Sequence, residues 1–290
     1  MTPHPDWIVP DWPAPANVRA IFTTRAGGVS PTPYASLNLG DHVGDAPGYV
    51  QANRQILRQT LQQTTGVRPV YLQQVHGTVV QPVHADTPDG AVADAAVTTQ
   101  PGVACTVMVA DCLPVLFTDD TGTVVAAAHA GWRGLQQGVL EQTFTAFCER
   151  FKPPALVEYA PLAINSIAKP LASSMANPIA DSIAPVTLAW LGPCIGPQAF
   201  EIGPEVLEAF VSHDPSARAC FVPAANGKWL ADLAGLARQR LQALGISQIS
   251  GNDGSAAWCT VSNPSRFFSH RRDSVALGGS GRMAACIWRV

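Results

Sequence analysis

Blocks of apolar residues follow one another along this chain, separated by polar segments rich in glycine and proline. Short runs of small and β-branched residues are typical of buried strands, and apolar residues three and four positions apart are typical of helices. The pattern predicts strands over 18–24, 70–75, 78–83, 103–110, 115–118, 123–128, 186–191, 246–249 and 283–288, and helices over 49–64, 134–151, 204–212 and 229–244. The irregular order favours one α/β domain with mixed β-sheets flanked by helices over a doubly wound parallel sheet.

The sequence predicts a single domain over residues 1–290, and two of its segments differ in composition from the rest. Residues 1–17 contain five prolines and two tryptophans, which predicts an extended N-terminal arm packed on the body. Residues 152–185 have few charges and repeated alanine, serine and proline, so we interpret them as an exposed low-complexity insertion without a catalytic role.

The composition and charge of the chain argue against several classes of protein. Only 13% of the 290 residues are charged, against about 25% in a typical protein, and the net charge is −3. No basic run is longer than Arg271-Arg272, which argues against a nucleic-acid surface. No leader segment and no run of 18 apolar residues is visible, and the seven cysteines have no framework spacing. We therefore expect a cytoplasmic monomer or homodimer with free thiols and no membrane partner.

Three residues with metal-binding side chains each follow an apolar run. They are His76, Cys112 and His129. Two imidazoles and one thiolate without a CxxC pair are typical of a catalytic zinc site, in which the fourth position holds water. The alternative is a buried cysteine that behaves as a small hydrophobic residue, beside two hydrogen-bonded histidines.

Polar residues close to these three suggest further roles. Arg133 begins a predicted helix, where free N–H groups favour anions, although a salt bridge would also explain it. Arg25 lies in a long loop over 25–45 and could clamp a phosphate or carboxylate. Asn38, in the same loop, suits a turn equally well. Asp111 directly precedes Cys112 and could orient His76 or His129, or merely end the strand.

Several motifs resemble one known family. QQVHG (73–77), ADCLPVLF (110–117) and AAHAGWRG (127–134) contain the three metal-binding candidates, and TTRAGGVS (23–30), SLNLG (36–40), GPCIG (192–196) and FFSHRRD (267–273) accompany them in order. Together they resemble the YfiH family, also called the laccase-domain, polyphenol-oxidase-like or peptidoglycan editing factor family.

The resemblance implies a fold, an activity and a set of residues. The fold would be the YfiH-like one, shared with bacterial toxin deamidases. The activity would be that of a zinc-dependent purine nucleoside phosphorylase, which converts adenosine, inosine or methylthioadenosine to free base and ribose 1-phosphate, with adenosine deaminase activity and no organic cofactor. The implied residues are His76, Cys112 and His129 as metal ligands and catalytic groups, Arg133 and Asp111 as further catalytic groups, and Arg25, Asn38 and Arg271 as substrate-binding groups.

Other functions remain open at the level of sequence. Cys112 could be the nucleophile of a hydrolase or amidase that edits peptidoglycan precursors, with His76 or His129 as its base. A copper laccase is disfavoured, because its multinuclear copper sites need more histidines than the seven present. A blue-copper site would need a weak axial methionine, which no motif supplies. A zinc-stabilised binding module would need a fourth ligand.

Overall fold

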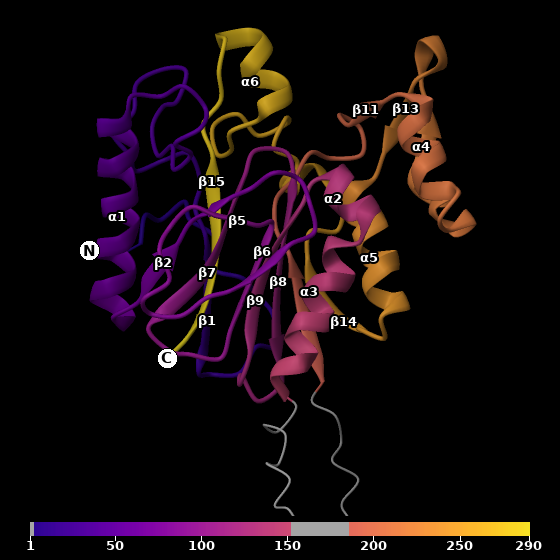
Figure 1. The fold of residues 1–290 in the computed structure, drawn as a ribbon. Coiled ribbons are helices and arrows are strands. Elements are labelled where there is room, and N and C mark those ends of the chain that lie inside the picture. Colours follow the sequence, from indigo (N-terminus) through magenta and orange to yellow (C-terminus); the bar gives the residue numbers. More distant parts are fainter. Residues whose placement is uncertain (1–2, 152–185) are drawn as a thin grey trace, which may run out of the picture.

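Two β-sheets pack face to face in the centre of the molecule, and helices cover their outer faces (Figure 1). The computed structural model describes residues 3–151 and 186–290. The four-stranded sheet has the order β1 (Val18–Phe22), β15 (Met283–Arg289), β7 (Val103–Val109), β2 (Arg68–Val70). The six-stranded sheet has the order β14 (Gln248–Gly251), β10 (Thr187–Leu191), β8 (Leu113–Asp119), β9 (Val125–Ala130), β6 (Ala95–Thr98), β4 (Val80–Pro82). Both sheets mix parallel and antiparallel pairs, so the predicted α/β domain with mixed sheets is confirmed.

Helices form the two outer layers. Helix α1 (Pro47–Thr65) covers the four-stranded sheet, and α3 (Val139–Cys148) and α5 (Leu233–Ala243) cover the six-stranded sheet (Figure 1). The remaining helices are α2 (Trp132–Gln137), α4 (Pro204–Val211), α6 (His270–Leu277), η1 (Glu149–Phe151), η2 (Pro215–Cys220), η3 (Ala225–Gly227) and η4 (Ala256–Trp258). The remaining strands are β11 (Glu201–Ile202), β12 (Phe221–Pro223) and β13 (Trp229–Ala231) in one small sheet, and β3 (Leu72–Gln73) and β5 (Ala91–Val92) in another.

The central strands are buried on both faces, which explains their unbroken apolar sequences. In β7, successive side chains enter different cores: Val107 packs between the two sheets, and Met108 packs toward α1. In β8, Phe117 packs toward the outer helices, whereas Leu116 packs between the sheets. A strand enclosed in this way is fixed in position, so it can hold the residues at its ends rigidly.

Three predicted elements differ from the observed ones. The helix predicted over 134–151 is interrupted at Gly138, whose φ of 98° ends α2 and begins α3. The first residues of the helix predicted over 229–244 form β13 instead, and Asp232 caps α5 by accepting a hydrogen bond from the N–H of Gly235. The strand predicted over 70–75 is divided between β2 and β3. Helix α6 was not predicted, and the insertion assigned to 152–185 lies outside the described residues.

The N-terminal segment packs on the four-stranded sheet. Ile8 forms a bridge with Phe22 of β1, and Trp7 is buried in the core beside α1. All seven cysteines are free, as the sequence predicted. Among the residues that the structure describes, no helix combines the length and the apolar composition needed to cross a bilayer.

Candidate metal centre

His76, Cys112 and His129 meet at one end of the six-stranded sheet. Their ligand atoms all lie within 4.8 Å of one another, and Cys112 Sγ is 3.7 Å from His76 Nε2. Strand register creates this meeting, because Pro114 of β8 pairs with His129 of β9 and Cys112 lies two residues before Pro114. The sequence prediction that these three side chains share one site is therefore consistent with the geometry of the fold.

The backbone around the three side chains is held in uncommon conformations. His76 has a φ of 62° and Asp111 a φ of 82°, both in the left-handed region that residues other than glycine seldom adopt. Gly131 approaches the site so closely that a Cβ atom there would lie 2.8 Å from His76 Cδ2 and 2.9 Å from Cys112 Sγ. Strained residues of this kind cluster at functional sites, where the surrounding structure maintains them.

Asp94 connects two of the three candidate ligands. Its carboxylate is fully buried and accepts a hydrogen bond from His129 Nδ1 at 2.8 Å. It also accepts from three consecutive backbone N–H groups, those of Val75 at 3.2 Å, His76 at 2.9 Å and Gly77 at 2.7 Å. A carboxylate that fixes the ring of one histidine and the backbone of another is the usual second partner of a metal-binding histidine, and it leaves Nε2 of His129 for a ligand.

The charges of the site depend on this network. Burial raises the pKa of the Cys112 thiol, but the charge and hydrogen bonding of His129 and His76 outweigh it and lower the pKa to about 6. Burial lowers the pKa of His129, but the Cys112 thiolate and Asp94 outweigh it and raise the pKa to about 9. Without a metal, the site therefore holds a thiolate beside an imidazolium, and a cation could replace the imidazolium proton.

The donor set fits a zinc ion. Ligand atoms bonded to one tetrahedral zinc lie roughly 3.3–3.6 Å apart; Cys112 Sγ and His76 Nε2 are 3.7 Å apart, and all three ligand atoms are within 4.8 Å, so small side-chain movements would bring them onto one ion. His76 is exposed at the surface of the pocket, whereas His129 is buried. Three protein ligands on one side of a pocket leave a position open toward the cavity, as in catalytic zinc sites.

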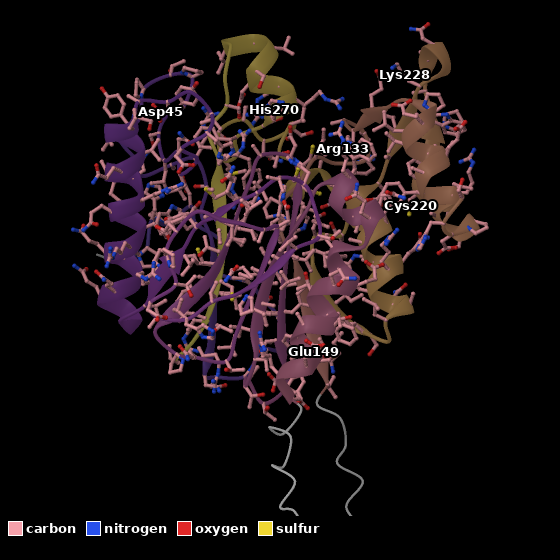
Figure 2. The ribbon with its side chains drawn as sticks, viewed as in Figure 1. Asp45, Arg133, Glu149, Cys220, Lys228 and His270 are labelled. Carbon is pink, nitrogen blue, oxygen red and sulfur yellow. The ribbon has the colours of Figure 1, made fainter. Side chains whose placement is uncertain are left out.

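A cavity of about 400 Å³ opens beside the three residues and is lined by positive groups. Arg133 begins α2 with its guanidinium 4.6 Å from the Trp132 ring. Arg271, in α6, donates to the carbonyl of Glu201 at 3.0 Å. Figure 2 shows Arg133 at the same end of the molecule as α6 and its labelled His270. The arginines that line the cavity are Arg133, Arg271 and Arg282, and the imidazoles of His42 and His270 also line it.

In the part of the chain that the structure describes, Asp111 forms no hydrogen bond with His76 or His129; its partners are other groups. Its carboxylate accepts from Thr260 Oγ1 at 2.5 Å, from Ser269 Oγ at 3.1 Å and from the backbone N–H of Arg271 at 2.6 Å. It thereby fixes the first turn of α6, and with it the backbone of Arg271, against the start of β8. Asp94 supplies the orienting carboxylate instead.

Two other predicted substrate-binding residues lie outside the lining of the cavity. Arg25 donates to the carbonyls of Ala35 and Pro264, each at 2.8 Å, and packs over Phe268. Asn38 is fully buried and accepts a hydrogen bond from the N–H of Arg282 at 2.9 Å. Both residues therefore stabilise loops, and Asn38 acts on the cavity only by positioning Arg282.

Arg282 was assigned no role from the sequence. It is largely buried, lines the cavity, and donates from Nη1 to the carbonyls of Ser280 and Gly281. Burial lowers its pKa, while the Cys112 and Asp111 charges act in the opposite direction. The segment GRMA (281–284), which also resembles a motif of the YfiH family, is the sequence signal that pointed to this arginine.

The comparisons with known proteins agree over nearly the whole chain. A family model described as multi-copper polyphenol oxidoreductase laccase matches residues 19–164 and 163–290. A Pseudomonas aeruginosa protein named purine nucleoside phosphorylase is 46% identical over 283 residues, which cover 97% of this chain and 98% of that protein. Escherichia coli YfiH, also named purine nucleoside phosphorylase, is 44% identical over 283 residues, which cover 98% of each.

Solved structures show the same similarity. A Neisseria meningitidis protein aligns with a TM-score of 0.76 at 43% identity, over 98% of this chain and 99% of that chain. YlmD from Geobacillus stearothermophilus aligns with a TM-score of 0.74 at 30% identity, over 94% of this chain and 92% of that chain.

Proposed function

The chain belongs to the laccase-like family that includes YfiH, and from this premise we propose that it is a purine nucleoside phosphorylase that depends on a bound zinc ion. The proposed substrates are adenosine, inosine and methylthioadenosine, and the products are the free base and a ribose 1-phosphate. The observation that carries the proposal is the pairing of the His76–Cys112–His129 site with a cavity lined by three arginines.

The arginines suit a phosphate nucleophile. In phosphorolysis a phosphate oxygen forms a bond to C1′ of the ribose while the bond to the base nitrogen breaks and the base keeps the electron pair. The positive charge that develops on the ribose ring favours a nearby anion, and guanidinium groups hold phosphate in a fixed orientation. Arg133, Arg271 and Arg282 are the candidates for this role, since each lines the cavity.

The rest of the cavity suits a nucleoside. Its volume of about 400 Å³ lies within the range of small-molecule pockets. Met108, Ile195 and Phe200 provide an apolar wall against which a purine ring can pack. A nucleoside and a phosphate held between this wall and the arginines would have their reacting atoms oriented, which lowers the entropic part of the activation barrier.

His76, Cys112 and His129 would hold the zinc ion, and Asp94 would fix their orientation. A zinc ion in such a site supplies a Lewis acid and an activated water at neutral pH. Because activated water is the nucleophile of zinc deaminases, we include adenosine deamination as a second activity of the same site.

Metal analysis and activity assays test the proposal together. We expect about one zinc ion per chain in the purified protein and phosphate-dependent release of base from adenosine and inosine. Cys112→Ala should lose both zinc and activity, whereas Cys220→Ala should keep both, because Cys220 lies in η2 outside the cavity lining. Phosphate-independent release of base by the wild type, or full activity of Cys112→Ala, would contradict the proposal.

A second candidate function is favoured by one observation. Cys112, His129 and Asp94 form a thiolate, an imidazolium and a buried carboxylate in contact, which is the arrangement of a cysteine hydrolase. A hydrolase that edits peptidoglycan precursors would need no metal. The test is whether metal-free protein releases an amino acid from such a precursor and loses this activity when a thiol reagent alkylates Cys112. If it does, the hydrolase assignment would replace the phosphorylase assignment.

A further inference from the structure

A second cavity, of about 500 Å³, lies between α1 and β2 and shares no lining residue with the candidate metal centre. We name it the α1 cavity. Its volume is within the range of small-molecule pockets, and no motif of the sequence assigned it a role. The polar residues that line it are two acids, Asp41 and Asp89, and Gln51, Arg54, Gln55, Arg58, Arg68 and Tyr71.

The α1 cavity has an excess of positive charge. Arg54 forms an ion pair with Asp41 at 3.2 Å, and Arg68 forms one with Asp89 at 3.5 Å. Both acids are well exposed, with 62% and 46% of their side-chain surface accessible, and such exposed pairs contribute little stability. Arg58 has no acidic partner among the described residues. An incoming anion could therefore bind Arg58 directly and compete with water and the two acids for the other arginines.

Two of the three guanidinium groups are already held in place. Arg54 donates from Nε to the carbonyl of Leu39 at 2.9 Å and packs 4.2 Å from the centre of the Tyr71 ring. Arg68 donates from Nη2 to the carbonyls of Thr87 and Ala85. Fixed donors lose little conformational entropy when a ligand binds, and this favours affinity at the α1 cavity.

The arrangement favours a phosphate group over a carboxylate. Three guanidinium groups around one cavity offer more donors than a carboxylate can accept, whereas a phosphate has three terminal oxygens and up to two charges. The amides of Gln51 and Gln55, on the same face of α1 as Arg54 and Arg58, can bind the hydroxyl groups of an attached sugar. Tyr71 is buried, and its hydroxyl has no hydrogen-bond partner among the described residues.

We propose that the α1 cavity binds a phosphorylated small molecule of the size of a sugar phosphate or a nucleotide, through Arg54, Arg58 and Arg68. The site goes beyond the proposed function, because it requires neither the metal nor phosphorolysis.

Two contacts connect the α1 cavity to the cavity of about 400 Å³ beside the candidate metal centre, which we call the catalytic cavity. Asp41, which pairs with Arg54, also lies 3.5 Å from His42 Nδ1, and His42 lines the catalytic cavity. Arg54 Nη2 is 4.0 Å from the sulfur of Met108, which lines the same cavity. A phosphate that replaces Asp41 as the partner of Arg54 Nη2 would release Asp41 and so alter the surroundings of His42, and occupancy of the α1 cavity should therefore change substrate binding.

Isothermal titration calorimetry of the full chain with ribose 5-phosphate and with AMP tests the site. We expect binding by the wild type and a loss of affinity of at least about tenfold in Arg58→Gln, because one charged hydrogen bond is removed. Arg150→Gln is the matched control: it removes the same charge from an exposed residue of η1, which follows α3 and does not line the α1 cavity; the neighbouring Glu149 is labelled at the lower end of the molecule in Figure 2.

Three results would overturn the site. The first is no binding of either compound by the wild type up to about 10 mM. The second is an equal loss in Arg58→Gln and Arg150→Gln, which indicates nonspecific attraction. The third is a loss in Arg271→Gln but not in Arg58→Gln, which places the compound in the catalytic cavity. None of these results bears on the phosphorylase activity, which is assayed separately.

A kinetic measurement tests the connection between the cavities and rests on the proposed function. Ribose 5-phosphate should change the KM for adenosine in the wild type but not in Arg58→Gln. The same change in both proteins would mean that the compound acts at the catalytic cavity, and the connection would then be wrong.

Discussion

Asp94→Asn is the substitution that the structure makes most informative, because one carboxylate there accepts four hydrogen bonds. Oδ1 accepts from His129 Nδ1 and the N–H of His76, and Oδ2 accepts from the N–H groups of Val75 and Gly77. An asparagine amide has one oxygen and one NH₂ group. In either orientation the NH₂ group, a donor, therefore faces two N–H donors of the protein. If the NH₂ group replaces Oδ2, both bonds from Val75 and Gly77 are lost.

The opposite orientation disturbs the candidate metal ligands. With NH₂ at the place of Oδ1, the N–H of His76 loses its acceptor, and His129 can pair with the amide only through an unprotonated Nδ1. The proton would then lie on Nε2, the nitrogen that a metal requires. Each buried donor without a partner costs about 1–3 kcal/mol, so the loss of two bonds predicts a destabilisation of about 2–6 kcal/mol.

Two assays measure the separate effects of Asp94→Asn. Urea denaturation of metal-free protein should show the loss of stability, and competition with a zinc chelator should show zinc affinity lowered by about 10–100-fold. Asp119→Asn is the control, since Asp119 is an equally buried carboxylate at the far end of β8 that accepts from Thr121, Thr123 and Val124. It should lower stability and leave zinc affinity unchanged. If Asp94→Asn bound zinc as tightly as the wild type, the positioning role of Asp94 would be refuted.

Four further predictions follow from the same geometry. Gly131→Ala should weaken zinc binding while the circular dichroism spectrum is retained, because its Cβ would contact His76 and Cys112 within 3.0 Å; unchanged zinc affinity would show that the ligands can move without loss. Arg282→Gln should raise the KM for phosphate by about tenfold, and an unchanged KM would exclude Arg282 from phosphate binding. Burial raises the pKa of Asp119, but hydrogen bonds from Thr121, Val124 and Thr123 outweigh it and lower the pKa. The stabilisation from Asp119 should therefore be complete above about pH 5 and decrease as pH falls below about 4, toward the folded-state pKa; the stability difference between wild type and Asp119→Asn at several pH values measures this. Chelation of the metal should abolish activity without unfolding the protein, as a thermal melt of the chelated protein would show.

The sequence was informative where burial determines the residue type. The runs that became β7, β8 and β9 are apolar without interruption because both faces of each strand are enclosed, so these strands could be predicted, with Cys112 and His129 near their ends. Helix α6 could not, because its sequence has almost no apolar stripe and Asp273 is its only buried side chain. The hydrogen bonds of Ser269 and Asp111 hold its first turn instead, and such long-range contacts leave no local pattern.

The roles of the polar residues near the site depended on strand register, which the sequence does not contain. Asp94 lies beside His129 because Ala95 of β6 pairs with Ala128 of β9. Asp111 is closer to Cys112 in sequence, yet its positive φ turns it toward Thr260 and α6. Adjacency in the chain therefore points to Asp111, whereas strand register brings Asp94 to the histidines.

The preformed geometry of the three ligands distinguishes a catalytic metal site from a metal that holds a fold together. In a zinc-stabilised module the free energy of metal binding is spent on folding, since the ligands come together only with the metal. Here the register of β8 and β9 brings Cys112 to His129, and Asp94 fixes His129 and the backbone of His76 without a metal. The strained φ angles of His76 and Asp111 are likewise maintained by hydrogen bonds to the protein. Because the protein itself maintains this arrangement, a zinc ion bound by the three residues would not be needed to hold the fold, and its remaining position would face the arginine-lined cavity.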